Sequence, residues 1–153
     1  MTLKLDYATE KDALRIAEIF WTAFRSNELF LSKIPTSRAY AGMLDALIRR
    51  SLAEIRDPHI ATLVVRDTEL DNKVVSFGNW TLPTASSEET PASVWPVETR
   101  MEVVEGWIER ISQAEEKALG GRPCYRGSKE ASWDTLRCLR LHRPDVFGNR
   151  SKA

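Results

Sequence analysis

The residues best suited to proton transfer in this chain are its two histidines, His59 and His142. An unperturbed histidine titrates near about pH 6.5, so it is able to take a proton from an attacking amine. Each histidine stands alone in the sequence, and His59 follows a proline at the entrance of a predicted strand. We therefore expect structural roles for both, and the sequence identifies no catalytic residue.

The cysteines and acidic residues form no recognisable metal site. Cys124 and Cys138 are too far apart for a CxxC pair, and no histidine cluster accompanies them. We expect two ordinary thiols and no bound metal. Glu88, Glu89 and Glu98 lie in or beside a polar segment, where carboxylates keep the chain solvated.

The composition is typical of one soluble domain: 153 residues, of which 42% are hydrophobic and 29% charged. The 22 basic residues equal the 22 acidic ones, which argues against a nucleic-acid partner or an anionic membrane. No apolar run approaches the roughly 20 residues that span a bilayer, and the N-terminus lacks the apolar stretch of a signal peptide. We expect a cytoplasmic protein, with a nuclear location left open.

The elements that must position a site begin with a short strand. Leu3, Leu5 and Tyr7 alternate with polar residues, which predicts that one face of this strand is buried. A helix follows, with Thr9 as its cap and Asp12 as the capping-box partner. Its predicted buried stripe consists of Ala13, Ile16, Ala17, Phe20 and Phe24.

The next segment, residues 27–37, contains Pro35 and is predicted to be a connection. A second helix begins near Thr36 or Ser37 and ends at Asp57, because the residue before a proline avoids the helical region. Its predicted buried stripe is Tyr40, Met43, Leu44, Leu47 and Ile48.

Two β-branched runs, residues 60–65 and 74–81, predict an antiparallel hairpin, with Gly78 marking a bulge or a close backbone approach. Residues 83–97 have the composition of a mobile loop. A third helix is expected from a Thr99 cap, with Glu102 as capping-box partner, to Gly120 and Gly121. Its predicted inner face consists of Met101, Val104, Ile108 and Ile111.

A last strand is expected at residues 135–142. The order β, α, α, β, β, α, β indicates an α+β domain with a mixed, largely antiparallel central sheet flanked by helices.

Several stretches of the chain resemble acetyltransferases of the GNAT superfamily. The opening, residues 5–12, and the helix end at residues 19–24 are similar to the start of that fold. Asp57-Pro58, residues 74–83 and residues 120–125 look like its fungal branch. The resemblance implies a GNAT-like part over residues 1–125, followed by a divergent or disordered tail over residues 126–153. It also implies a C-terminally truncated form of the acyl-CoA N-acyltransferase fold.

In that family, the strand and loop that come after the stretch resembling residues 120–125 hold acetyl-CoA. They do so through backbone amides and a glycine-containing turn at a helix N-terminus. The resemblance makes Leu139, Leu141, Gly148, Asn149 and Arg150 the candidate cofactor-binding residues. Phe147, Arg150 and Lys152 depart from the family's loop pattern.

The acceptor would be a small-molecule or peptide amine. Phe24, Phe30 and Trp80 are the candidates for its pocket, although aromatic residues at such positions more often belong to the core.

Two hypotheses follow. The first is an N-acetyltransferase that transfers an acetyl group from acetyl-CoA to an amine. The second is a non-catalytic remnant or interaction module that has lost the cofactor loop and self-associates through an exposed sheet edge. An ordered strand at residues 135–142, followed by a phosphate-cradling turn, would favour the first.

Overall fold

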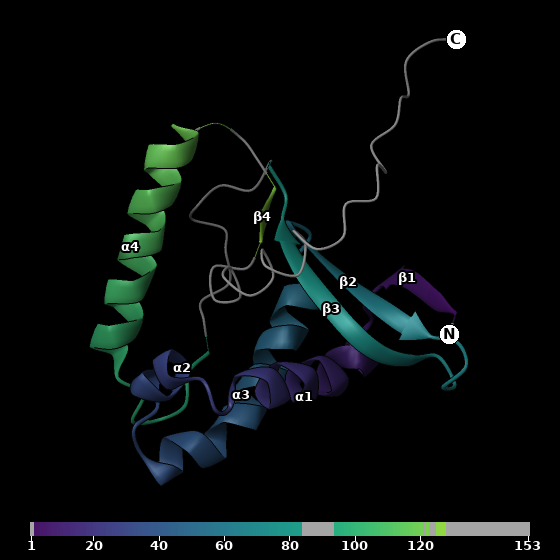
Figure 1. Cartoon of the computed structure of the whole chain (residues 1–153), viewed down its shortest axis with the longest axis horizontal. Coiled ribbons are helices and arrows are strands. Elements are labelled where there is room, and N and C mark those ends of the chain that lie inside the picture. Colours follow the sequence, from purple (N-terminus) through teal and green to yellow (C-terminus); the bar gives the residue numbers. More distant parts are fainter. Residues whose placement is uncertain (1, 84–93, 121, 123–124, 128–153) are drawn as a thin grey trace.

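A computed structural model describes residues 2–83, 94–120, 122 and 125–127 (Figure 1). The chain begins with strand β1 and a short 3-10 turn, continues through three helices into a hairpin, and ends its described part with a long helix and a short strand. In chain order the elements are β1 (Leu3–Tyr7), η1 (Glu10–Asp12), α1 (Ala13–Phe24), α2 (Glu28–Lys33), α3 (Ser37–Arg56), β2 (Ile60–Asp67), β3 (Lys73–Thr81), α4 (Met101–Leu119) and β4 (Arg126–Gly127).

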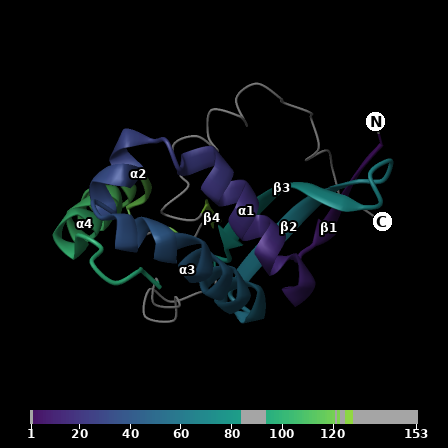
Figure 2. The same cartoon turned by 90° about the horizontal axis from the view of Figure 1, so that it is seen from below.

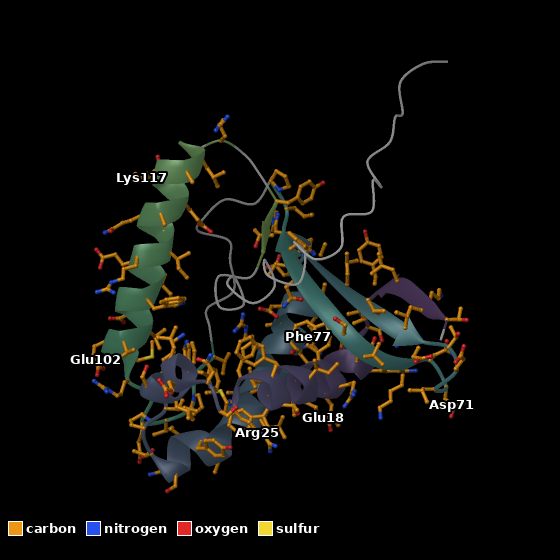
Figure 3. All side chains as sticks on the ribbon, viewed as in Figure 1. Glu18, Arg25, Asp71, Phe77, Glu102 and Lys117 are labelled. Atoms are coloured by element: carbon orange, nitrogen blue, oxygen red, sulfur yellow. The ribbon has the colours of Figure 1, made fainter. Side chains whose placement is uncertain are left out.

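The strands form one sheet in the order β1-β2-β3-β4, and each neighbouring pair is antiparallel. The predicted α+β class and the predicted hairpin are therefore confirmed. The turn between β2 and β3 places Asp71 and Asn72 at φ 51° and 58°. Apart from glycine, asparagine and aspartate are the residues that tolerate this left-handed conformation best. Asp71 marks this tip in Figure 3.

The bulge in β3 does not lie at Gly78, so that prediction is wrong. Gly78 pairs regularly with Leu63, and the register instead shifts between Val65 and Arg66 on β2. Val65 is opposite Ser76 and Arg66 is opposite Val74, which leaves Val75 as the extra residue. A Cβ on Gly78 would meet the Trp80 indole nitrogen at 3.5 Å, which is ordinary van der Waals contact.

The bulge brings Val74 and Phe77 to the same face of the sheet. Both pack against the cluster of Ile16 and Val64, and Phe77 lies between β3 and the helices (Figure 3). The carbonyl oxygen of Val74 accepts a hydrogen bond from Arg15 Nε at 3.0 Å. The bulge therefore fixes how α1 docks on β3.

Helices α1 and α3 pack against each other and against this face of the sheet (Figure 2). The predicted capping box is present: the Asp12 carboxylate accepts from the Thr9 backbone N–H at 2.8 Å. Thr36 caps α3 by accepting from the Ala39 N–H at 3.1 Å. Of the predicted stripes, Ala13, Ile16, Ala17, Phe20, Met43 and Leu47 are buried, Phe24, Leu44 and Ile48 are half-buried, and Tyr40 is exposed.

The opposite face of the sheet corrects the expectation for β1. Leu3, Leu5 and Tyr7 are 51%, 65% and 69% exposed, so this apolar face is not buried. Strand alternation places them across the sheet from α1 and α3. The hydrophobic pattern correctly predicts a strand, but it does not say whether a partner covers the apolar face.

Helix α2 was not expected, because Pro35 made the whole segment look like a connection. Asn27 caps this helix by accepting from the Phe30 N–H at 3.0 Å. The helix carries Phe30 and Lys33 into the core, where both are buried.

Helix α4 begins later than expected, at Met101 after Arg100, so Thr99 is not its cap and Glu102 forms no capping box with it. Of the predicted inner face, Val104 alone is buried, while Met101 is exposed. The helix ends as predicted at Gly120, whose φ of 56° is left-handed. Figure 1 shows that α4 stands apart from the sheet and lies nearest to α2.

Three predicted segments lie wholly or partly outside the described residues. The strand at residues 135–142 lies wholly outside, as do residues 84–93 of the predicted mobile loop and residues 128–153 of the predicted tail. At the start of that tail, Gly127 pairs with Trp80 as part of β4. At the end of the predicted loop, Trp95 packs against the core and Pro96 is buried.

Candidate functional site

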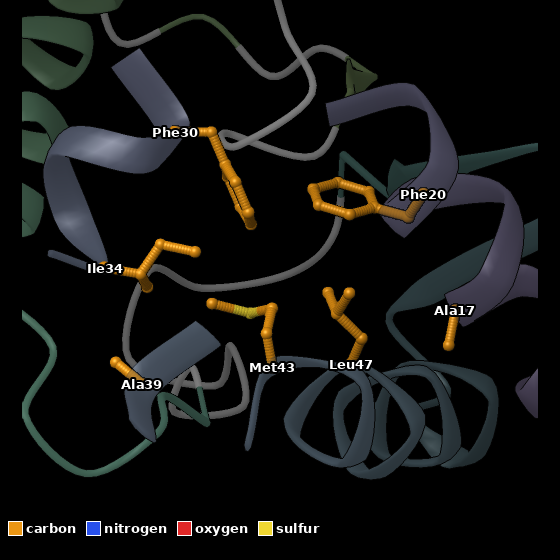
Figure 4. Packing of buried hydrophobic residues seen from close by; sticks show 7 residues of the cluster. All are labelled: Ala17, Phe20, Phe30, Ile34, Ala39, Met43 and Leu47. Carbon is orange, nitrogen blue, oxygen red and sulfur yellow. The ribbon is translucent and has the colours of Figure 1, made fainter. Parts of the chain in front are cut away.

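A cavity of about 20 Å³ lies where α1, α2 and α3 meet the segment that precedes α4. This volume suits one water-sized particle. Figure 4 shows four of its apolar side chains, Phe20, Phe30, Met43 and Leu47, converging from the three helices. The rest of the lining comes from Lys33, Arg50, Val94 and Trp95.

Lys33 is the most unusual group at this cavity, because it is a lysine that is only 4% exposed. Its ammonium nitrogen lies 5.8 Å from the ring centroid of Trp95 and 5.3 Å from that of Trp107. Burial lowers the pKa of Lys33 from its ordinary value, and the positive charge of Arg50 lowers it further. Within the described part of the chain, no carboxylate forms an ion pair with it.

Local structure explains why Lys33 points inward. It is the last residue of α2, whose start is fixed by the Asn27 cap. Its carbonyl oxygen accepts the Arg100 N–H at 2.8 Å, which ties the end of α2 to the start of α4. These two contacts set the direction of α2, and the side chains of Phe30 and Lys33 consequently enter the core.

Arg50 connects the cavity to the sheet through a short polar chain. Its Nε donates to Glu54 one helical turn later at 2.8 Å, and the two side chains are only 16% and 13% exposed. The other Glu54 oxygen accepts from the Asn79 side-chain amide on β3. Glu54 therefore balances the charge of Arg50, and no such group balances Lys33 among the residues the structure describes.

Two further hydrogen-bond donors are buried nearby. The indole nitrogens of Trp95 and Trp107 have no acceptor within the described residues. An indole N–H donates and cannot accept, and a lysine ammonium is likewise a donor alone. The surroundings of the cavity thus combine several donors with an otherwise apolar lining.

The structure brings two of the three predicted pocket residues together. The ring centroids of Phe24 and Phe30 lie 6.4 Å apart, and Phe30 lines the cavity. Trp80 lies elsewhere: its neighbour Asn79 reaches α3, so strand alternation directs Trp80 to the opposite face of the sheet. An acceptor role for these aromatics stays a prediction.

The predicted cofactor residues Leu139, Leu141, Gly148, Asn149 and Arg150 lie outside the described residues, as does His142. His59 lies in the turn before β2, where its backbone N–H donates to Asp57 at 2.8 Å. In residues 2–83 and 94–127, as far as they are described, no cluster of His, Cys, Asp or Glu could hold a metal ion. In the same part, no helix is both long and apolar enough to cross a bilayer.

Sequence reasoning missed Lys33, Arg50, Trp95 and Trp107. Lys33 was placed in a connection, where a lysine is normally solvated. The i, i+4 spacing of Arg50 and Glu54 was visible in the sequence, as was Trp95 between two nearby prolines in a polar segment. Only the packing of α2 against the start of α4 brings these groups together.

No protein-family model matches this chain, and no curated protein matches it either.

Proposed function

We propose that this chain carries the first strands and helices of a GNAT-like N-acetyltransferase that uses acetyl-CoA. The observation that carries the proposal is the element order from β1 to β4, in which helices α1 and α3 precede an antiparallel hairpin. Apart from the additional helix α2, this is the order on which the sequence resemblance rests. The capping box at Thr9 and Asp12, in the opening segment that resembles the family, also supports it.

The proposed reaction is direct acyl transfer. The acceptor amine attacks the thioester carbonyl of acetyl-CoA, a C–N bond forms, the C–S bond breaks, and CoA leaves as the thiolate while the amine loses a proton. Proximity and backbone N–H groups facing the developing oxyanion would supply the acceleration. The acceptor is a small-molecule or peptide amine, with Phe24 and Phe30 as proposed walls of its pocket.

The test is calorimetric titration of the full chain with acetyl-CoA, with desulfo-CoA as a second ligand. Saturable binding of both supports the proposal, since the nucleotide and pantetheine parts are shared. An Arg150→Ala variant should bind at least several-fold more weakly, because a guanidinium contributes to holding phosphate. Arg38→Ala is the matched control, because Arg38 is 74% exposed on α3. No heat from a folded sample would refute the proposal.

A second candidate function is self-association through β1, and the sequence of this edge strand favours it. In the described part of the chain, β1 is the outer strand on one side of the sheet, and an edge strand can serve as a template for another strand. An antiparallel pairing of two copies centred on Leu5 would place Lys4 of one copy opposite Asp6 of the other. The same pairing would place Leu3 opposite Tyr7, both of which are exposed.

Sedimentation equilibrium over a range of protein concentrations tests this second function. Asp6→Lys should weaken the dimer, because it sets two lysines opposite each other. The double swap Lys4→Asp with Asp6→Lys should restore it, because opposite charges face each other again. A wild-type chain that stays monomeric, or a double swap that associates no better than Asp6→Lys, would contradict self-association through this edge.

A further inference from the structure

The hydrogen-bonding groups around the Lys33 cavity are unbalanced. Lys33 and Arg50 both line it, and the buried indole N–H groups of Trp95 and Trp107 belong to the two rings near the Lys33 ammonium. All four groups are donors. The remaining lining is aromatic or aliphatic: Phe20, Phe30, Met43, Leu47 and Val94.

The charges of the described residues around the cavity are unbalanced as well, with an excess of positive charge. Arg50 is paired with Glu54, whereas no carboxylate of the described residues pairs with Lys33, which is only 4% exposed. The faces of the two indoles attract this cation, but they accept no conventional hydrogen bond from it. A buried charge is costly unless it is paired and hydrogen-bonded. One negative charge at the cavity would satisfy both needs.

We propose that the cavity beside Lys33 binds one small monovalent anion, either a halide ion or the carboxylate group of a small ligand. The charge of the occupant follows from Lys33, which has no acidic partner in the described part of the chain, and its chemistry follows from a site rich in donors. The volume of about 20 Å³ favours a small ion, or the end of a small carboxylate ligand, over a large ligand.

Burial and the charge of Arg50 lower the pKa of Lys33, and a bound anion would raise it, so anion binding should be coupled to protonation of Lys33. The site does not depend on acetyl-CoA binding or on the β1 edge. Its failure is therefore distinguishable from failure of either proposed function.

The experiment is a titration of the full chain with sodium chloride and, separately, with sodium acetate, followed by tryptophan fluorescence and by thermal unfolding. Ionic strength is held constant with sodium sulfate, whose divalent anion does not match a single positive charge. We expect a saturable fluorescence change and a rise in Tm that fits one site. A response to chloride alone identifies a halide site, and a response to acetate alone or to both identifies a site that accepts carboxylates.

Variants test whether the response comes from this cavity. Lys33→Met keeps the length and packing of the side chain and should weaken anion binding at least tenfold. Trp95→Phe keeps an aromatic ring but removes the N–H, and it should weaken binding several-fold. Lys11→Met, at an exposed lysine of the η1 turn, should bind the anion like the wild type.

Two results would overturn the proposal. One is a folded wild-type chain that shows no saturable response to either anion. The other is a response of unchanged affinity in both Lys33→Met and Trp95→Phe, which would place the anion elsewhere.

Discussion

Replacing Asp12 by asparagine should destabilise the protein strongly, because this carboxylate joins the start of α1 to strand β2. Its two oxygens accept from Arg66 at 2.9 and 2.8 Å in a bidentate pair. One of them also accepts from the Thr9 backbone N–H at 2.8 Å. Asparagine keeps the shape of the side chain, but it removes the charge and one of the two acceptor oxygens.

The expected loss follows from how well the pair is shielded. The Asp12 and Arg66 side chains are 10% and 18% exposed. Breaking a fully buried pair costs about 3–5 kcal/mol. Partial solvent access to Arg66, and the nearby carboxylate of Asp6 at 3.8 Å from its Nε, reduce this cost. We expect a loss of about 2–3 kcal/mol in the free energy of unfolding, which lowers a urea midpoint by about 1 M.

The chain supplies a matched control with the same chemistry at the surface. Glu10 accepts from Arg56 at 3.0 and 2.8 Å, but these side chains are 57% and 61% exposed. Glu10→Gln should therefore change stability little, because solvent screens an exposed pair. Urea unfolding of both variants, followed by circular dichroism, measures the difference. Equal losses in the two variants, or no loss in Asp12→Asn, would refute the argument that burial decides the strength of these pairs.

Three other predictions concern pH and backbone conformation. Hydrogen bonds from Arg66 hold the pKa of Asp12 below its ordinary value of 3.8. The contribution of Asp12 to the free energy of unfolding is therefore present above that pH and is lost as the pH falls. In urea titrations below pH 4, the stability difference between wild type and Asp12→Asn should shrink progressively. Thr36→Ala removes the α3 cap and should cost about 1 kcal/mol, whereas Ser37→Ala, one residue later, should be nearly neutral by the same measurement. Gly120→Ala should lower the free energy of unfolding by about 1 kcal/mol, because the φ of Gly120 is 56°. Gly106→Ala inside α4 should raise it by about 0.5–1 kcal/mol, because alanine favours a helix and nothing lies within 4 Å of the new Cβ. Thermal unfolding of the two variants checks both signs.

Much of the fold could be predicted because its signals are local. Thr9 with Asp12, Thr36, Asp57-Pro58 and Gly120 each fix a helix end through one or two residues, and the structure confirms all four. The β-branched runs predicted β2 and β3 for the same reason. These features depend on backbone conformation and on neighbours within a few positions, which a single sequence contains.

What could not be predicted depends on packing between distant segments. Leu3, Leu5 and Tyr7 have the alternation of a buried face, but burial requires a covering element, and alternation cannot reveal one. The predicted buried face of α4 was wrong for the same reason, since Val104 is the one residue of that face that is buried. In α2, the Asn27 cap was present in the sequence, but a helix of six residues has too little periodicity to outweigh Pro35.

The candidate site was the least predictable feature. Sequence reasoning chose Phe24, Phe30 and Trp80 as aromatic residues, and two of these lie together in the structure. It did not find Lys33, because the burial of a lysine contradicts its usual solvation and arises from a tertiary contact between the ends of two helices. Whether a charged side chain is buried depends on the groups around it, and these come from four separate segments.

The bulge at Val75 makes the β3 strand tolerant of a change in length. Two valines occupy positions 74 and 75, and deleting either one leaves a single valine opposite Arg66 and next to Ser76. The alternation of side chains would then be regular, and both the remaining valine and Phe77 would still face the helices. A deletion in most strands inverts the faces of all residues on one side of it. Here the loss of one residue would bring the strand back into phase, so length variation in this strand need not disturb the core.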